Sequence, residues 1–131
     1  MVAPLRAEIA REKSTEELDA LVPAWMTVPD VAEQTGQDQR VVRRWLQERE
    51  LVAVRRGERS VAQVPAAFIT DEGPLNHLKG TLSVLRDSGY TDVEALSWLF
   101  TPDDTLPGTP IDALRANRKT EVRRRAQALS F

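Results

Sequence analysis

The chain has 131 residues, 41% of them hydrophobic, which is the length and composition of one folded domain and excludes a fully disordered protein. It contains no cysteine and one histidine, so disulfides, thiol catalysis, cysteine-bound metals and sites built from several imidazoles are excluded. No apolar run reaches the roughly 18 residues that a bilayer requires, and no apolar leader follows the first residues, so we expect a cytoplasmic protein without a membrane partner. The formal net charge of −2 conceals a basic middle, because residues 1–36 carry −4, residues 37–59 carry +3 and residues 60–131 carry −1.

Residues 1–26 are predicted to form an N-terminal tail with one short helix. The first dozen residues are charged and poor in large apolar side chains, which is equally typical of a mobile tail and of a frayed helix. Ser14 and Thr15 stand before two glutamates, as residues at a helix start do, and Pro23 ends the short helix that follows.

The next segment carries the signals of two helices joined by a tight turn. Thr27 can cap the first helix, and Gly36 can end it in the left-handed conformation. Asp38 can cap a second helix that runs to about Glu50. Two helices joined by a short turn that contains glycine are the helix-turn-helix pattern.

A β-hairpin is predicted directly after the second helix. The short β-branched runs 51–54 and 60–65 flank a polar loop that contains Gly57. A helix-turn-helix followed by such a hairpin is the winged variant, so residues 27–70 are expected to form a winged helix-turn-helix domain.

Residues 71–131 are predicted to form a C-terminal helical subdomain, so the whole fold is expected to be mainly α with a small β-hairpin wing. Thr91 opens a short helix through a capping box, and Thr109 begins a last helix that continues to about Leu129. A helix that ends at Gly89 is indicated by a stripe of Leu75, Leu78, Leu82 and Leu85.

The second helix of the helix-turn-helix is amphipathic. At 100° per residue its apolar side chains share one face, which consists of Val41, Val42, Trp45 and Leu46. The opposite face presents Arg40, Arg43, Arg44 and Gln47, with Gln39 near the helix start. Arginine pairs with guanine and glutamine with adenine through two hydrogen bonds in the major groove, each pair contributing about 1–3 kcal/mol of discrimination. These residues are therefore the candidates for reading double-stranded DNA.

The predicted hairpin carries a second basic group. Arg55, Arg56 and Arg59 surround Gly57, where long cationic side chains can hold the DNA backbone. An arginine-rich helix face alone is commonly just a solvated surface, but the joint pattern of helix, glycine turn, basic helix and basic hairpin favours DNA binding. The function expected from it is transcriptional or nucleoid regulation, with a homodimer as a candidate state because a net acidic chain gains from doubled contacts.

No residue pattern points to catalysis, so no enzyme activity, cofactor or small-molecule substrate is expected. His77 has no second histidine for a metal site, and the carboxylate pairs 71–72 and 103–104 lie in turn-like sequence beside glycine or proline.

The last predicted helix leaves several interpretations open. Between Arg115 and Arg125 the sequence holds six basic residues and one acidic residue, Glu121. This helix can pack on the domain, form a dimer or partner surface, or contact phosphates. A protein-interaction adaptor, antitoxin-like or excisionase-like, that acts through the C-terminal helices is therefore the rival function.

Six runs resemble a small actinobacterial family of winged-helix DNA-binding proteins, namely 28–36 (VPDVAEQTG), 41–46 (VVRRWL), 51–56 (LVAVRR), 89–92 (GYTD), 98–103 (WLFTPD) and 121–128 (EVRRRAQA). The resemblance covers about residues 27–131 and implies a winged helix-turn-helix with added C-terminal helices that binds double-stranded DNA. A member of that family is regulated by a membrane-anchored Ser/Thr protein kinase, which phosphorylates threonine in the N-terminal tail. Residues 1–26 do not align clearly, so Ser14 and Thr15, the hydroxyls that precede Thr27, are candidates for phosphorylation, with helix capping as the alternative role.

Overall fold

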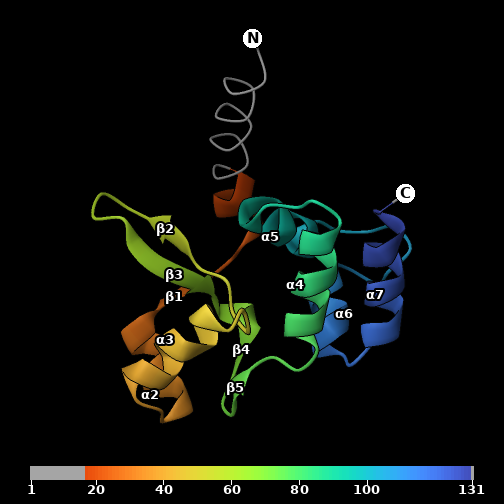
Figure 1. The fold of residues 1–131 in the computed structure, drawn as a ribbon. Coiled ribbons are helices and arrows are strands. Elements are labelled where there is room, and N and C mark those ends of the chain that lie inside the picture. Colours follow the sequence, from red (N-terminus) through yellow and green to blue (C-terminus); the bar gives the residue numbers. More distant parts are fainter. Residues whose placement is uncertain (1–16, 131) are drawn as a thin grey trace.

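The computed structural model describes residues 17–130, in which two groups of elements lie side by side (Figure 1). The first group contains a short helix over residues 17–21, helices α2 (Val28–Thr35) and α3 (Gln39–Gln47), and the strands β1 (Trp25–Thr27), β2 (Val54–Arg56), β3 (Val61–Pro65), β4 (Ile69–Thr70) and β5 (Gly73–Pro74). A 3₁₀ turn, η1 (Ala66–Phe68), lies between β3 and β4, and the second group comprises α4 (Leu78–Asp87), α5 (Asp92–Phe100), α6 (Pro110–Arg115) and α7 (Lys119–Ala128). The mainly helical fold with a small antiparallel sheet confirms the predicted fold class. Across residues 17–130, every helix is too short or too polar to span a bilayer.

Local capping positions α2 and α3 as the sequence predicts. The hydroxyl of Thr27 accepts from the Asp30 N–H at 3.3 Å, while the Asp30 carboxylate accepts from the Thr27 N–H at 3.0 Å. These bonds to Thr27 hold the pKa of Asp30 below its usual value. Gly36 ends α2 with a φ of 70°, and the Asp38 side chain caps α3. The turn between the helices therefore has one defined geometry, which sets the direction of α3.

Helix α3 ends at Gln47, before the predicted limit at Glu50. Arg49 turns the chain with a φ of 63°, and Leu51 and Val52 then enter the core with 1% and 2% of their surface exposed. The prediction of a strand over residues 51–54 was therefore wrong at its start, because these apolar side chains fill the core instead of extending the hairpin.

The three-stranded sheet has the order β1-β3-β2, with both pairs antiparallel (Figure 1). Strand β1 was not predicted, since three residues between a proline and a helix cap are too few for an alternating pattern. It pairs with β3 through Trp25 opposite Pro65. The sheet thus includes residues N-terminal to position 27, where the sequence places the beginning of the winged domain.

The C-terminal group differs from the prediction at its last helix, which is broken into α6 and α7. Asn117 adopts a φ of 65° between them, a conformation that asparagine tolerates better than most residues. Because the N–H of Arg118 bonds back to the Ala113 carbonyl at 2.8 Å, the break is a closed turn that folds α7 against α6 and α4. Asp71 and Glu72 form a turn as predicted, but the two short strands that flank this turn, β4 and β5, were not predicted.

Buried apolar side chains from both groups form one continuous core cluster. Leu18 and Val22, from the first described helix and the residue after it, are 1% and 3% exposed and belong to it. The ring centroids of Phe68 and Phe100 lie 5.8 Å apart and join η1 to α5. The shared core therefore fixes the position of α3 relative to the C-terminal helices.

Candidate nucleic-acid interface

The outward face of α3 has the composition that the sequence predicts. Val42 is 1% exposed and faces the core, with Trp45 and Leu46 half-buried beside it. The polar residues of the helix are all exposed, namely Gln39, Arg40, Arg43, Arg44 and Gln47. We call these five residues the α3 face.

Few interactions within the described chain hold the guanidinium groups of the α3 face. Arg40 lies 3.9 Å from the Asp38 carboxylate, but the two side chains are 88% and 61% exposed, so water screens the pair. Arg43 donates to the Gln39 side chain at 3.4 Å, a long bond between neighbouring turns. Both side chains can therefore turn toward an approaching ligand at little energetic cost.

The hairpin between β2 and β3 separates its three arginines. Arg59 lies in the exposed turn over residues 57–60, where Gly57 has a φ of 78°. Arg55 is exposed on β2 and donates to the Ser60 carbonyl at 2.8 Å, which holds its side chain beside the turn. These two arginines lie together at the hairpin end.

Arg56 lies on the opposite sheet face from Arg55, because successive strand residues alternate. Its guanidinium lies 4.3 Å from the centre of the Trp25 ring, pairs with the Asp19 carboxylate and donates to the Gln63 side chain. The structure therefore does not bring Arg56 together with the other two hairpin arginines. Instead, Arg56 joins the wing to the helix over residues 17–21.

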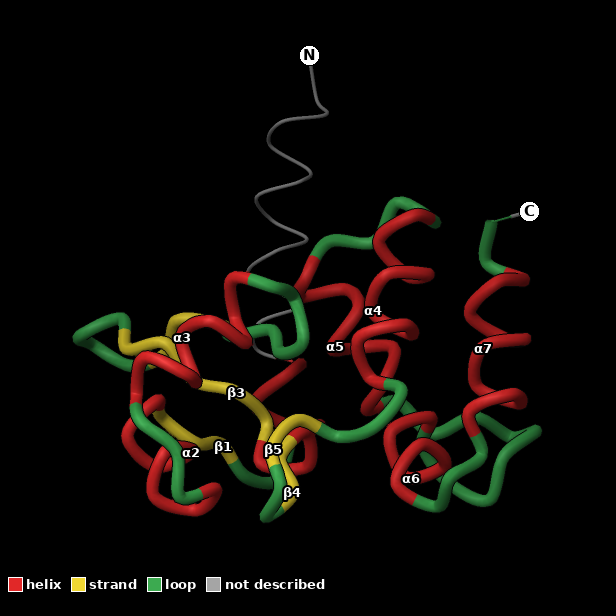
Figure 2. The backbone as a smooth tube through the Cα atoms, turned by 60° about the horizontal axis from the view of Figure 1, so that its bottom comes forward, coloured by secondary structure: helices red, strands yellow, loops and turns green. Residues whose placement is uncertain are grey.

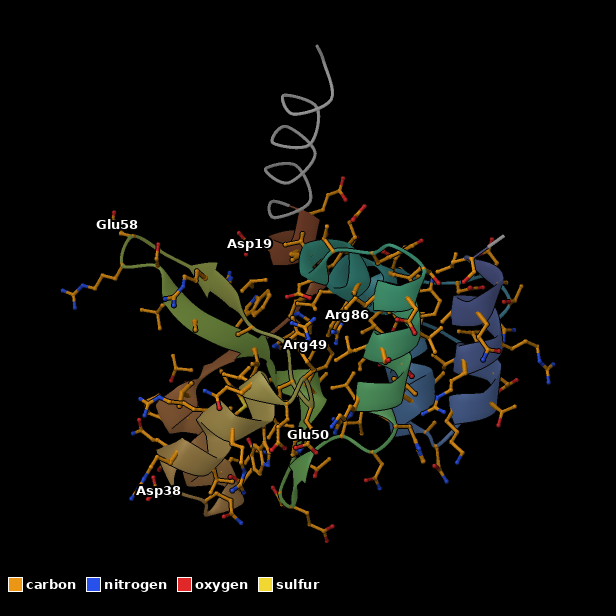
Figure 3. All side chains as sticks on the ribbon, viewed as in Figure 1. Asp19, Asp38, Arg49, Glu50, Glu58 and Arg86 are labelled. Carbon is orange, nitrogen blue, oxygen red and sulfur yellow. The ribbon has the colours of Figure 1, made fainter. Side chains whose placement is uncertain are left out.

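Helix α3 and the β2–β3 hairpin lie on the same side of the molecule. In Figures 1 and 2, α3 and the β2–β3 hairpin project together on the left, away from α4, α6 and α7. In Figure 3, Asp38 at the start of α3 and Glu58 in the hairpin turn mark the two ends of this surface. The C-terminal helices leave the α3 face uncovered.

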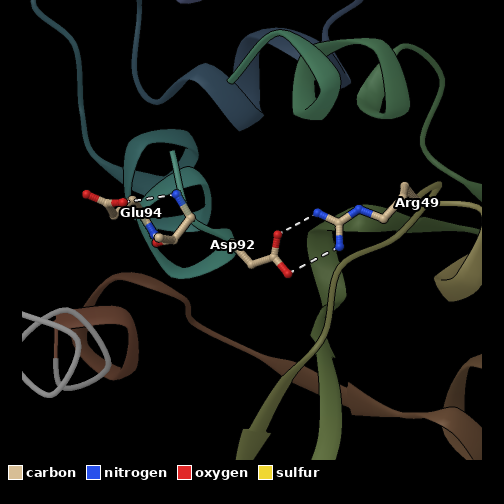
Figure 4. Close-up of polar contacts among 4 residues, drawn as sticks. Arg49, Asp92 and Glu94 are labelled. Carbon is tan, nitrogen blue, oxygen red and sulfur yellow. Dashed lines mark hydrogen bonds and ion pairs between the residues drawn. The ribbon is translucent and has the colours of Figure 1, made fainter. Parts of the chain in front are cut away.

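An interaction that the sequence does not reveal fixes the turn after α3 (Figure 4). The Arg49 guanidinium donates to both oxygens of Asp92, at 2.5 and 3.3 Å, across 43 positions of sequence. The hydrogen bonds that Arg49 donates to Asp92 raise the pKa of Arg49. Asp92 lies in the first turn of α5, where a carboxylate also interacts favourably with the helix dipole. This pair joins the end of the helix-turn-helix to the C-terminal group.

We expect a double-mutant cycle with Arg49→Gln and Asp92→Asn to give a coupling free energy of about 1 kcal/mol in unfolding experiments. The side chains are 35% and 44% exposed, so water reduces the value below that of a buried pair. The coupling should fall as salt is added, because ions screen exposed charges. Additive effects of the two changes at low salt would contradict this interpretation.

The sequence also singles out His77 and the hydroxyl groups of Ser14 and Thr15. His77 is half-buried before α4, where ring desolvation and the charges of Lys119 and Arg123 hold its pKa below the usual value, and such neighbours disfavour a bound cation. Ser14 and Thr15 lie outside the described residues.

Strand β1, helices α2 and α3 and the β2–β3 hairpin together define a winged helix-turn-helix protein, extended here by four further helices. Two family models match the chain, one described as the winged helix-turn-helix domain of DNA-binding protein Rv2175c, over residues 14–69, and one as the Rv2175c C-terminal domain of unknown function, over residues 75–130. The chain is 41% identical over 117 residues to DNA-binding protein Rv2175c of Mycobacterium tuberculosis (strain ATCC 25618 / H37Rv), and the match covers 79% of each chain. It also matches the NMR structure of Rv2175c with a TM-score of 0.72 and 37% identity over 82% of each chain. The chain belongs to the Rv2175c family.

Proposed function

We propose that this chain binds double-stranded DNA without catalysis and regulates transcription or nucleoid structure. The observation that carries the proposal is the α3 face, where three arginines and two glutamines are exposed together on the second helix of a helix-turn-helix. The printed name of its relative, DNA-binding protein Rv2175c, supports the same function.

The proposed contacts divide into base reading and backbone binding. An α-helix fits the major groove, where Arg40, Arg43, Arg44 and Gln47 would meet base edges and Gln39 would lie near the start of the contact. Arg55 and Arg59 would bind phosphates from the hairpin end. We assign Arg56 a positioning role, since its guanidinium is held by Asp19 and Trp25.

The proposal is tested by selecting bound sequences from random duplex DNA at two salt concentrations. We expect a recovered motif and an affinity that falls as salt rises, because bound arginines release counterions from the phosphates. A motif with dyad symmetry would support a homodimer. Failure to retain any duplex at low salt would refute DNA binding.

Within this function, Arg59→Ala should weaken binding to all duplexes by a similar factor. A phosphate contact carries no base information, so the logarithmic salt slope should become shallower by about 0.9 while the preferred sequence stays the same. Glu58→Gln in the same turn is the matched control, because it removes a negative charge and should strengthen binding. Anisotropy titrations at several salt concentrations measure both effects, and a changed motif in Arg59→Ala would count against a backbone role.

We further propose that a Ser/Thr protein kinase lowers the DNA affinity by modifying Ser14 or Thr15. A phosphate adds about −1.5 to −2 charges, which would repel DNA or compete for the hairpin arginines.

The rival adaptor function has less support, since Val61 on β3 is the one large hydrophobic residue that is exposed among residues 17–130. The described C-terminal helices therefore lack the apolar centre that protein interfaces use.

A further inference from the structure

A cationic hollow runs along α7, far from the α3 face. Its volume is about 280 Å³, and it is lined by Lys119, Thr120, Arg123, Arg124 and Gln127. Three of these five side chains are basic, and none is acidic or apolar. We call this surface the α7 hollow.

The basic residues of the α7 hollow differ from the other basic residues around this helix. Arg118 pairs with Glu121 at 3.8 Å, and Arg125 donates to the hydroxyl of Thr105 at 2.7 Å and to two carbonyl groups. Among the described residues, no hydrogen bond or ion pair engages the side chain of Arg123, and its buried Nε–H has no acceptor. The half-buried guanidinium therefore has no partner within residues 17–130, and an anionic ligand would supply acceptors for those of its N–H groups that reach the surface.

The absence of a side chain at Gly80 leaves space for the Arg123 guanidinium. Gly80 lies inside α4, where alanine would favour the helix. A Cβ at this position would lie 2.7 Å from Cζ of Arg123 and closer still to Nη2. A side chain at position 80 would therefore displace the guanidinium from its place against α4.

The potential near this hollow is positive enough to affect a neighbouring group. Desolvation of the ring, together with the charges of Lys119 and Arg123, lowers the pKa of His77. The residues Lys119, Arg123 and Gln127 follow each other at intervals of four, so they form a row of about 12 Å along the helix. A row of this kind fits a chain of several phosphates better than a single phosphate group.

Helix α7 lies away from the proposed DNA-binding side. Figures 1 and 2 place α7 at the opposite side of the molecule from α3 and the β2–β3 hairpin, with α4 between them. This separation favours a ligand in the α7 hollow that is a different molecule or a distant segment of the same DNA.

We propose that the α7 hollow binds the sugar-phosphate backbone of a second duplex segment, so that one chain bridges two segments of DNA. The inference rests on the proposed function, which supplies the first segment at α3. Lys119, Arg123 and Arg124 neutralise phosphates of the second segment without reading its sequence.

The test uses the full chain and two duplexes. One duplex, bearing the selected motif, is immobilised, and capture of a second, fluorescent duplex of unrelated sequence is measured with and without protein. Affinity for the motif duplex alone is measured separately by anisotropy. For the variant Lys119→Gln/Arg123→Gln/Arg124→Gln we expect at least a tenfold loss of second-duplex capture, while motif affinity changes less than about threefold. Arg86→Gln, which removes an exposed charge on α4 outside the hollow, should leave capture unchanged.

A second variant separates position from charge and from folding. Gly80→Ala keeps every charge and favours the helix, but it displaces the Arg123 guanidinium, so capture should fall while the melting temperature stays the same or rises. Thermal melts of the triple variant show whether it is folded, and Arg124→Gln, at an exposed position, should by itself lower capture.

Each outcome bears on a distinct claim. Undiminished capture by both the triple variant and Gly80→Ala would overturn the inference while leaving DNA binding at α3 intact, and it would point to bridging by a dimer. Absence of any binding to the motif duplex would instead refute the proposed function. If the side-chain signals of Arg123 in NMR spectra respond to a phosphothreonine peptide and not to duplex DNA, the hollow binds phosphopeptides and the inference is wrong.

Discussion

Replacing both Arg43 and Arg44 with alanine is expected to abolish sequence-specific DNA binding. Both side chains are exposed on the α3 face, and an arginine that pairs with guanine through two bonds contributes about 1–3 kcal/mol of discrimination. Loss of two such contacts corresponds to roughly a 30-fold to 20,000-fold drop in the ratio of specific to non-specific affinity. Competition titrations of motif and random duplexes measure this ratio directly.

The fold should survive this double change, because neither side chain touches the core. Arg43→Ala and Arg44→Ala are also measured one at a time. Arg86→Ala, which removes one positive charge from an exposed site on α4, is the control for the loss of charge. Arg86→Ala should leave the ratio unchanged. Equal discrimination by the wild-type chain and the double variant, with both folded, would show that α3 does not read the bases.

The α3 face could be predicted from the sequence because its determinants are local. The cap residues Thr27 and Asp38 and the left-handed Gly36 each act within a few positions, and all three have the predicted roles. The helical period then places Val42 in the core and the polar residues outside. Each of these signals lies within about ten residues of the element that it defines.

The rest of the candidate site depends on contacts between distant segments. The alternation of strand residues sends Arg55 and Arg56 to opposite faces, but the sequence places both in the loop, and only the structure shows that β2 extends to Arg56. The partner of Arg56, Asp19, is 37 positions away, and that of Arg49 is 43 positions away. No local pattern indicates either pair.

The same limit explains the errors in the C-terminal helices. Arg118 to Glu121 continues the helical pattern, and nothing around Asn117 contains a proline or glycine that would announce a break. Ile111 and Leu114 on α6 and Val122 and Ala126 on α7 are all buried, and at 100° per residue they would also share one face of a straight helix. The helical pattern therefore gives no sign of the break.

A continuous core makes the winged domain and the C-terminal helices depend on each other. We expect Phe68→Ala to destabilise the whole chain by about 3–5 kcal/mol, because it opens a cavity where the side chain is fully buried. Phe68 lies in η1, directly after the hairpin strand β3, and its ring packs against that of Phe100 on α5. The cavity would therefore lie between the two groups of elements. For a chain of this length the melting temperature should fall by roughly 10–20 °C.

Calorimetry of Phe68→Ala tests both the size and the site of this effect. A single transition at lower temperature is expected, because a chain with one core unfolds as one unit. Phe68→Leu should cost less than half as much, since leucine fills most of the space, and Val61→Ala at an exposed position should have almost no effect. Two separate transitions in Phe68→Ala, or a melting temperature within about 3 °C of the wild type, would show that the two halves fold independently. In that case α3 would be positioned by the winged domain alone, and Arg49 and Asp92 would be dispensable for the orientation of its DNA-binding face.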